Sequence, residues 1–228
     1  MINFGNLNGI TSLFLFCIEV IFLINMLIFS EKNKLNKLAF GMVILLFSYQ
    51  FIEFLICYVK LQNSIWIYLA YVVIGFLPPL GFYFASKFTG KLYDKYTKFV
   101  FLPIIVFTIL YAFQIDNFNV IKCTPFFVDY SYPYADVYGF FYYLPVVAVI
   151  YLLWDFKKNT QDRVKRKLSI VLLSGYLLAF IPGWFFAIAF SGALAVVESL
   201  LCKLAFFLVV AFAYFAITNK NNNVNLKQ

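Results

Sequence analysis

Seven hydrophobic stretches, each long enough to cross a bilayer, fill most of this chain and restrict what it can fold into. A transmembrane helix needs about 20 mostly apolar residues. In lipid the backbone must satisfy its own hydrogen bonds, and the stretches lack the alternation of β-barrel strands, so we expect α-helices. The expected spans are 9–29, 39–59, 64–86, 98–115, 137–155, 168–190 and 194–217. The sequence therefore predicts an all-α membrane protein, a seven-transmembrane-helix bundle.

Composition leaves little room for a soluble domain. Of the 228 residues 64% are hydrophobic and 12% are charged, whereas soluble domains carry about 25% charged residues. We expect one transmembrane domain over residues 1–218 and a short polar cytoplasmic tail over 219–228. The longest connection, 116–136, is expected to be an aromatic and acidic loop.

The positive charges predict the orientation, because Lys and Arg collect in cytoplasmic loops. They gather in the loops at 30–38, 87–98 and 156–167 and in the tail. The alternate loops hold only Lys60 and Lys122, and Lys203 lies within a span. We therefore expect the N-terminus outside and the C-terminus in the cytoplasm. The net charge of +8 is explained by this topology and does not indicate a nucleic-acid partner.

Ionisable residues inside the spans indicate where a site lies, because charges in the membrane are costly and usually functional or paired. Helical rise puts all of them in the middle and outer half of the bilayer. Gln50 lies one turn from one of the acids, on the same helix face, and can hydrogen-bond the carboxylate or a ligand. The predicted cluster, which opens outward, consists of Glu19, Gln50, Glu53, Glu198 and Lys203.

Two interpretations of this cluster stay open. Lys203 can pair with Glu19 or Glu53 and simply lock the last helix against the first two. Alternatively, the cluster is a pocket for a polar or charged ligand, or a proton-coupled switch.

The outer loop suggests a lid over such a cavity. Its candidate lid residues are Asp129, Tyr130, Tyr132, Tyr134 and Asp136, with Tyr138 beside them. Aromatic residues at this density are also typical of the membrane interface, where they form a belt.

Prolines within the spans predict irregular helices. Pro78 and Pro79 with Gly81 should bend or break the third span, and Pro145 and Pro182 should bend the fifth and sixth. Broken helices often line cavities in membrane transporters.

Several kinds of chemistry are missing from the chain. It contains no histidine, which excludes His general bases, Ser-His triads and His-ligated metals. The cysteines form no C-x-x-C pair, although Cys57 and Cys123 both fall at the outer face, where a disulfide can form. No nucleotide-binding motif is present. We expect no enzyme activity, no cofactor and no metal.

Two resemblances add to this prediction. The segments YQFIEFLIC, with Gln50 and Glu53, and ESLLCKLAFF, with Ser199 and Cys202, resemble an uncharacterised group of prokaryotic seven-helix membrane proteins. That group shows Q-x-x-E in helix two, proline in helix three and S-x-x-C in helix seven. More loosely, FLPPLGFYFASKFTGK followed by a basic loop is similar to the seven-helix sensory region of bacterial histidine kinases. The chain departs from those kinases in having no cytoplasmic output domain. The resemblances imply a multi-pass protein of the cell membrane, in a bacterium the inner membrane.

The leading functional hypothesis is a receptor- or sensor-like protein, which binds a small ligand or senses the membrane through the polar cluster. It would use the loops at 30–38, 87–98 and 156–167 to contact a cytoplasmic protein partner. A small-solute transporter with a midplane site is the first alternative, although no internal repeat is visible. A non-catalytic structural subunit of a membrane complex is the second.

Overall fold

The structure is a computed structural model that describes residues 8–91, 94–189 and 194–220 and is mostly helical (79%). Six helical segments within these residues are long and apolar enough to cross a membrane. A further apolar helix over Thr97–Ala112 is shorter. These helices match the expected spans in order and, within a few residues, in position. The helices are α1 (Ile10–Phe29), α2 (Lys34–Cys57), α3 (Ser64–Gly75), α4 (Leu77–Thr89), α5 (Asp94–Ala112), α6 (Ala135–Asn159), α7 (Arg163–Ala189), α8 (Leu194–Leu204) and α9 (Phe206–Thr218).

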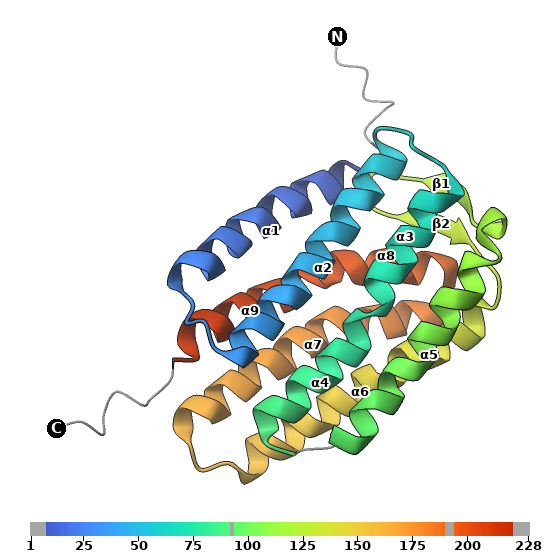
Figure 1. Cartoon of the computed structure of the whole chain (residues 1–228). Helices are drawn as coiled ribbons and strands as arrows, with labels where there is room; N and C mark the ends of the chain where they lie inside the picture. The colour runs from blue at the N-terminus through green and yellow to red at the C-terminus, as the bar shows by residue number, and fades with distance from the viewer. Residues whose placement is uncertain (1–7, 92–93, 190–193, 221–228) are drawn as a thin grey trace.

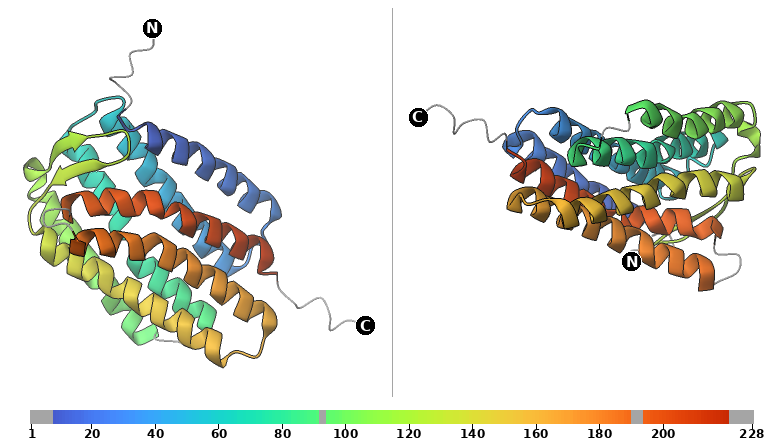
Figure 2. Two further views of the ribbon diagram at one scale, coloured as in Figure 1. Left: turned by 180° about the vertical axis from the view of Figure 1, so that it is seen from behind. Right: turned by 90° about the horizontal axis from the view of Figure 1, so that it is seen from below.

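The helices pack in two layers. One layer contains α1, α2, the α3/α4 pair and α5, and the other contains α6, α7 and α9, with α8 continuing along the line of α9 (Figure 1, Figure 2). Helix α2 contacts α1, α9 and α4, and α1 also contacts α9. The first two spans and the last one are therefore neighbours, which brings their polar residues within reach of one another.

Small residues allow α7 and α9 to approach closely. A Cβ atom added to Gly175 would lie 2.8 Å from Ala211 Cβ and 3.2 Å from the carbonyl oxygen of Phe207. Close backbone approach at small residues is a common way to pack helices in membranes, where burial from lipid supplies no hydrophobic driving force.

Two of the spans are interrupted. The third breaks at Phe76, between α3 and α4, with Pro78 and Pro79 in the first turn of α4, as the prolines predict. The last breaks at Ala205, between α8 and α9, where no proline or glycine occurs. Helices α6 and α7 continue through Pro145 and Pro182.

The connection over 116–136 is not the loop that the sequence predicts. It contains a short 3-10 helix, Ile115–Asn117, and an antiparallel hairpin of β1 (Asn119–Cys123) and β2 (Val128–Ser131). Val128 and Tyr130 of β2 are buried against the bundle. The hairpin covers one end of the bundle, which we call the hairpin end (Figure 1).

The opposite end is closed by asparagines. Asn36 Nδ2 donates hydrogen bonds to the carbonyl oxygens of Ala216 (3.0 Å) and Asn219 (3.2 Å). Asn219 Nδ2 donates in return to Asn36 Oδ1 (2.9 Å). These bonds fix the end of α9 to the start of α2. Of the predicted tail, only residues 219 and 220 are among the described residues.

Candidate functional site

A buried ion pair lies between α2 and α8, below the hairpin. Lys203 Nζ lies 2.7 Å from Glu53 Oε2. The two side chains are 9% and 1% exposed. The structure therefore selects Glu53 from the two partners that the sequence left open for this lysine.

Two further oxygens complete the surroundings of the ammonium. Lys203 Nζ donates to Gln50 Oε1 (2.8 Å) and to Ser12 Oγ (2.8 Å). With Glu53, these acceptors use all three N–H donors that a lysine ammonium carries. The ion pair thus joins α1, α2 and α8, and each N–H of the ammonium has an acceptor.

The side-chain amide of Gln50 donates to the backbone of the interrupted last span and not to Glu53. Its Nε2 donates to the carbonyl oxygen of Cys202 (2.8 Å), three residues before the break at Ala205. An interruption in an apolar interior leaves backbone groups that need another partner. Gln50 therefore does not bond the Glu53 carboxylate, one of the two partners that the sequence allowed for it, because its amide is engaged by the ammonium and by this carbonyl.

Ser199 connects the ion pair to the hairpin. Its hydroxyl donates to Glu53 Oε1 (2.8 Å) and accepts from the backbone N–H of Val128 in β2 (3.0 Å). The sequence named Ser199 only within a motif and did not place it in the site. A usable signal was present, because Ser199 and Lys203 lie four residues apart on one helix face.

Three other attachments hold the hairpin in place. A disulfide joins Cys57, the last residue of α2, to Cys123 at the end of β1, as the sequence allowed. The backbone N–H groups of Gly9 and Thr11 donate to the carbonyl oxygens of Thr124 (3.0 Å) and Pro125 (3.3 Å). Gly9 has a φ of 77°, and a Cβ there would lie 3.0 Å from Cys57 Cβ, so this close approach favours glycine.

The inner face of the hairpin packs on an aromatic cluster. The ring of Tyr71 in α3 lies 5.9 Å from that of Tyr130, 4.2 Å from that of Tyr132 and 5.8 Å from that of Tyr138, between ring centroids. The distances to Tyr130 and Tyr138 are typical of favourable aromatic pairs, and the ring of Tyr132 lies closer still. Tyr130 and Tyr132, two of the predicted lid residues, therefore pack against the bundle at the hairpin end.

The remaining lid residues do not cover the site. Tyr134 is 57% exposed and Asp136 is exposed, so the structure does not place these two predicted lid residues against the buried cluster. Both stand where the chain enters α6: Tyr134 precedes the helix with a φ of 58°, and Asp136 lies in its first turn. Asp129 is half-buried and lies opposite Lys122 in the hairpin register.

The other two predicted acids differ from Glu53. Glu19 is fully buried, but neither of its carboxyl oxygens has a hydrogen-bond partner among the described residues. Glu198 belongs to α8, and its side chain lies outside the described residues. Glu19, Gln50 and Glu53 are all buried beneath the hairpin. The expectation of a cluster that opens outward is therefore wrong for this conformation, because the hairpin closes it.

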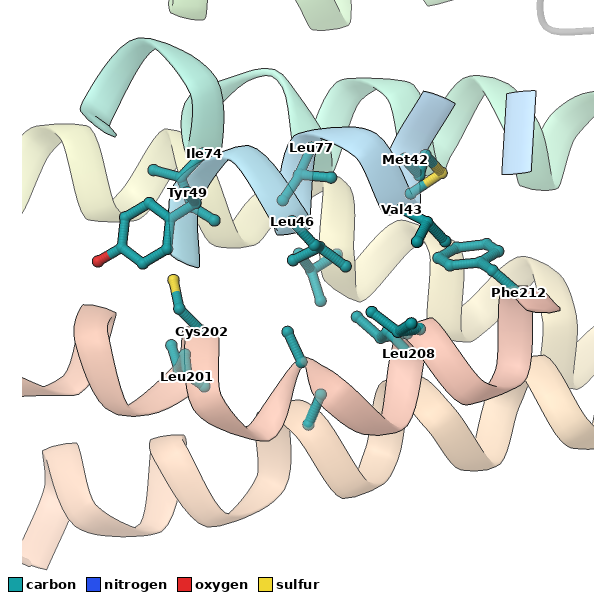
Figure 3. Packing of buried hydrophobic residues seen from close by; sticks show 14 of the residues in the cluster. Met42, Val43, Leu46, Tyr49, Ile74, Leu77, Leu201, Cys202, Leu208 and Phe212 are labelled. Atoms are coloured by element: carbon teal, nitrogen blue, oxygen red, sulfur yellow. The ribbon is translucent and has the colours of Figure 1, made fainter. Parts of the chain in front are cut away.

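Two small cavities lie beside the polar cluster, at the level of both helix breaks. They measure about 30 Å³ and about 20 Å³, taken as the space open to the centre of a water molecule, and each is large enough for water. Both are lined by Ile74, Tyr142, Leu201 and Cys202. Figure 3 shows Leu46 and Tyr49 of α2 and Cys202 of α8 directed toward this region. The second cavity is mainly lined by tyrosines, contributed by α2, α3, β2 and α6.

The chemistry of the site is that of a charge held by hydrogen bonds. Within the described residues, no group of three or more His, Cys, Asp or Glu side chains is arranged to hold a metal ion. The arrangement can hold a buried ion pair and link it to the hairpin.

No family model, curated protein or solved structure matches this chain.

Proposed function

We propose that the protein is a seven-helix receptor or sensor of the cell membrane. In this proposal the hairpin faces outside and the Lys203–Glu53 pair below it is the sensing element. The observation that carries the proposal is the hydroxyl of Ser199, which bonds both Glu53 and the backbone of Val128. A movement of the hairpin changes the hydrogen bonds of Glu53. Conversely, a change in the charge of Glu53 alters the hydrogen bond that attaches Val128 to Ser199.

The path of the chain supports seven crossings. The start of α1 is bonded to the hairpin, and the end of α9 is bonded to the start of α2 at the opposite end. An odd number of crossings is needed to join these two points. Helix α5 supplies the seventh: the turn before it carries Lys91, which pairs with Asp155 near the end of α6, and Tyr111 near its own end bonds Pro133 beside the hairpin. Its 19 residues span about 28 Å at 1.5 Å per residue.

The charges support an orientation with the hairpin outside. The basic loops at 30–38, 87–98 and 156–167 all lie at the end away from the hairpin, and cytoplasmic loops collect positive charge. These loops are also the surface at which a cytoplasmic partner would bind.

The conformation described here is closed. The hairpin is held by a disulfide, two backbone hydrogen bonds and Ser199, and the interior cavities are far smaller than a typical ligand pocket. A small polar ligand would therefore act by competing for the groups that hold β2. Such a ligand shifts the population toward a conformation in which this strand is displaced.

A transporter is the second candidate, and one observation favours it. Both interrupted spans, at Phe76 and Ala205, lie beside the cavities, and broken helices commonly form the sites of transporters. Transport would require a path past the hairpin, which is covalently tied to α2.

One experiment separates the two candidates. Purified protein in lipid nanodiscs is screened with small amino acids, sugars and amines for a rise in melting temperature. Each compound that binds is then tested for uptake in proteoliposomes. A receptor binds without accumulation. Accumulation that is lost in Glu53→Gln but kept in Asp155→Asn identifies a transporter, and binding that is equal in wild type and Ser199→Ala contradicts the proposed sensing element.

The orientation has its own test. Single cysteines replace the exposed residues Ile121 in the hairpin and Val164 at the start of α7, in a Cys17→Ser background. A membrane-impermeant maleimide added to intact cells should label position 121 alone. Labelling of position 164 from outside would reverse the proposed topology.

A further inference from the structure

The buried cluster has an unequal number of acids and bases. Among the described side chains, Glu19, Glu53 and Lys203 are the Asp, Glu, Lys or Arg residues buried within α1, α2 and α8 beneath the hairpin. Lys203 neutralises one carboxylate, that of Glu53. A second carboxylate without a counter-charge is costly in an apolar interior. Glu19 therefore needs a proton or another cation.

Glu19 is buried as completely as Glu53 but differs in its bonding. Glu19 and Glu53 are 0% and 1% exposed. Glu53 accepts hydrogen bonds at both oxygens, from Ser199 and from Lys203. Neither oxygen of Glu19 has a partner among the residues that the structure describes. One of the two acids is thus satisfied by the fold, and the other is available for a ligand.

The lysine contacts the helices that carry both acids. Lys203 Nζ donates to Ser12 in α1 in addition to its hydrogen bond with Glu53 in α2. Ser12 lies on the same buried face of α1 as Glu19, roughly 10 Å away along the helix at 1.5 Å per residue. The ammonium is carried on a flexible four-carbon stem, which can redirect it along this face of α1.

The surroundings give the lysine freedom to move. The regular helix ends one residue after Lys203 and is interrupted at Ala205. The cavity of about 30 Å³ is lined by Leu201, Cys202 and Ala205 of the same segment. Residues adjacent to Lys203 therefore border open space, which lets this segment of the last span shift with little displacement of packed atoms.

We propose that Glu19 is a proton-binding site and the alternative partner of the Lys203 ammonium. With a proton on Glu19, Lys203 stays on Glu53 and the hairpin is held through Ser199. When Glu19 releases its proton to water on the hairpin side, the ammonium moves to the new carboxylate. Glu53 is then a buried carboxylate without its counter-charge, and this favours displacement of the hairpin, because the displacement admits water to the carboxylate. This inference rests on the proposed sensor function and names the proton as what that site responds to.

The other titratable groups near Glu19 are few. Helix α2 contributes Glu53, and α8 contributes Lys203, the buried thiol of Cys202 and Glu198, whose side chain is outside the described residues. Helix α9 has no Asp, Glu, Lys or Arg, and its one tyrosine, Tyr214, lies toward the far end. On α1 itself, Cys17 is exposed. The charge balance that governs the lysine is therefore set by the two buried glutamates.

The experiment measures the hairpin as the pH is raised from mildly acidic to mildly alkaline. Spin labels are placed on cysteines that replace the exposed residues Phe126, in the hairpin turn, and Tyr151, in α6. The background is Cys17→Ser with the native disulfide intact, in lipid nanodiscs. Wild type should gain a population with a longer distance between the labels at high pH. Glu19→Gln, which cannot ionise, should reduce that population about tenfold, equivalent to about 1.4 kcal/mol.

Control variants make the outcomes distinct. Asp155→Asn, at the exposed pair on the other end, should behave as wild type. Glu53→Gln, which has no second carboxylate to be left unpaired, should lose the gain of the longer distance at high pH. A pH response that persists in Glu19→Gln overturns the assignment of Glu19 but leaves the sensor in place. A hairpin that never moves with pH in wild type overturns the proton inference, while the ligand screen independently decides the proposed function.

A second measurement applies if Glu19→Gln does not fold. Infrared difference spectra of wild type between the two pH extremes should show the loss of a protonated carboxyl band. Glu19→Asp, which keeps a titratable carboxyl group, should shift that band in frequency. A band that is absent in wild type, or that is identical in Glu19→Asp, contradicts the proposal.

Discussion

The molecule contains two lysine–carboxylate pairs at opposite ends, and their surroundings differ sharply. Lys203 and Glu53 are 9% and 1% exposed, and every polar atom of the pair is bonded to an element from elsewhere in the chain. Lys91 and Asp155 are 41% and 26% exposed. The Asp155 carboxylate also accepts a hydrogen bond from its helix neighbour Asn159 (2.9 Å). The first pair organises three helices and a hairpin, whereas the second joins the ends of α4 and α6.

This difference shows that the role of an ion pair is set by what surrounds it. An exposed pair is screened by water and salt and contributes little. A buried pair gains little net stability from its formation, but breaking it leaves an uncompensated charge. The pair at the hairpin end is therefore suited to switching, because a small chemical change there has a large energetic consequence.

The largest effect should come from Glu53→Gln. This substitution leaves the Lys203 ammonium buried without its counter-charge, and we expect it to lower the free energy of unfolding by about 3–5 kcal/mol. The measurement is reversible unfolding in lipid bicelles. Combining it with Lys203→Met should recover part of the loss, because the unpaired charge is then removed. A double variant that is as unstable as the sum of both single variants would mean that the pair does not act as a unit.

Removal of the disulfide should have the next largest effect. Replacing Cys57 and Cys123 together by serine frees a link between residues 66 positions apart. We expect a loss of about 2–4 kcal/mol, with faster proteolysis in the hairpin. Cys17→Ser is the matched control, because Cys17 is free and exposed. Equal stability of the oxidised and serine proteins would show that Ser199 and the backbone bonds hold the hairpin without the disulfide.

The spans and one of the two breaks were predictable from sequence, and the reasons are local. Hydropathy alone locates the helices, and Pro78 and Pro79 locate the break at Phe76. The break at Ala205 has no such signal. The carbonyl oxygen of Cys202 before this break accepts a hydrogen bond from the amide of Gln50, which is 152 residues away in sequence. Contacts of this kind are determined by tertiary packing and are invisible to a reading of neighbouring residues.

The candidate site was predictable in its members but not in its connections. Helix depth brings Glu19, Glu53 and Lys203 to one level, yet it does not say which acid bonds the lysine. That choice depends on Ser199 and the hairpin, and the short strands β1 and β2 were read as a loop rich in aromatics. Strand β1 has no buried residue and β2 is only four residues long, so neither gives a clear alternating pattern in the sequence.

Ser199→Ala should have a smaller effect on the hairpin end. It removes one acceptor from the Val128 N–H and one donor from Glu53, at a cost of about 1–3 kcal/mol. Amide hydrogen exchange should increase over β2. Ser174→Ala is the matched control, since its hydroxyl is exposed and bonds only the carbonyl of Ile170 within its own helix. Unchanged exchange at Val128 in Ser199→Ala would remove the proposed coupling between hairpin and charge.

The smallest effect should come from Asp155→Asn, the same carboxylate-to-amide change as Glu53→Gln at the exposed pair. We expect a loss of less than about 1 kcal/mol, because the Lys91 ammonium and the new amide both remain accessible to water. The loss should shrink further in high salt, where exposed charges are screened, whereas the loss in Glu53→Gln should depend little on salt because water and ions do not reach it. The measurement is the free energy of unfolding of both variants, relative to wild type, at low and at high salt. If Asp155→Asn costs as much as Glu53→Gln, burial does not separate the two pairs. There would then be no reason to assign the switch to the Lys203–Glu53 pair rather than to the Lys91–Asp155 pair.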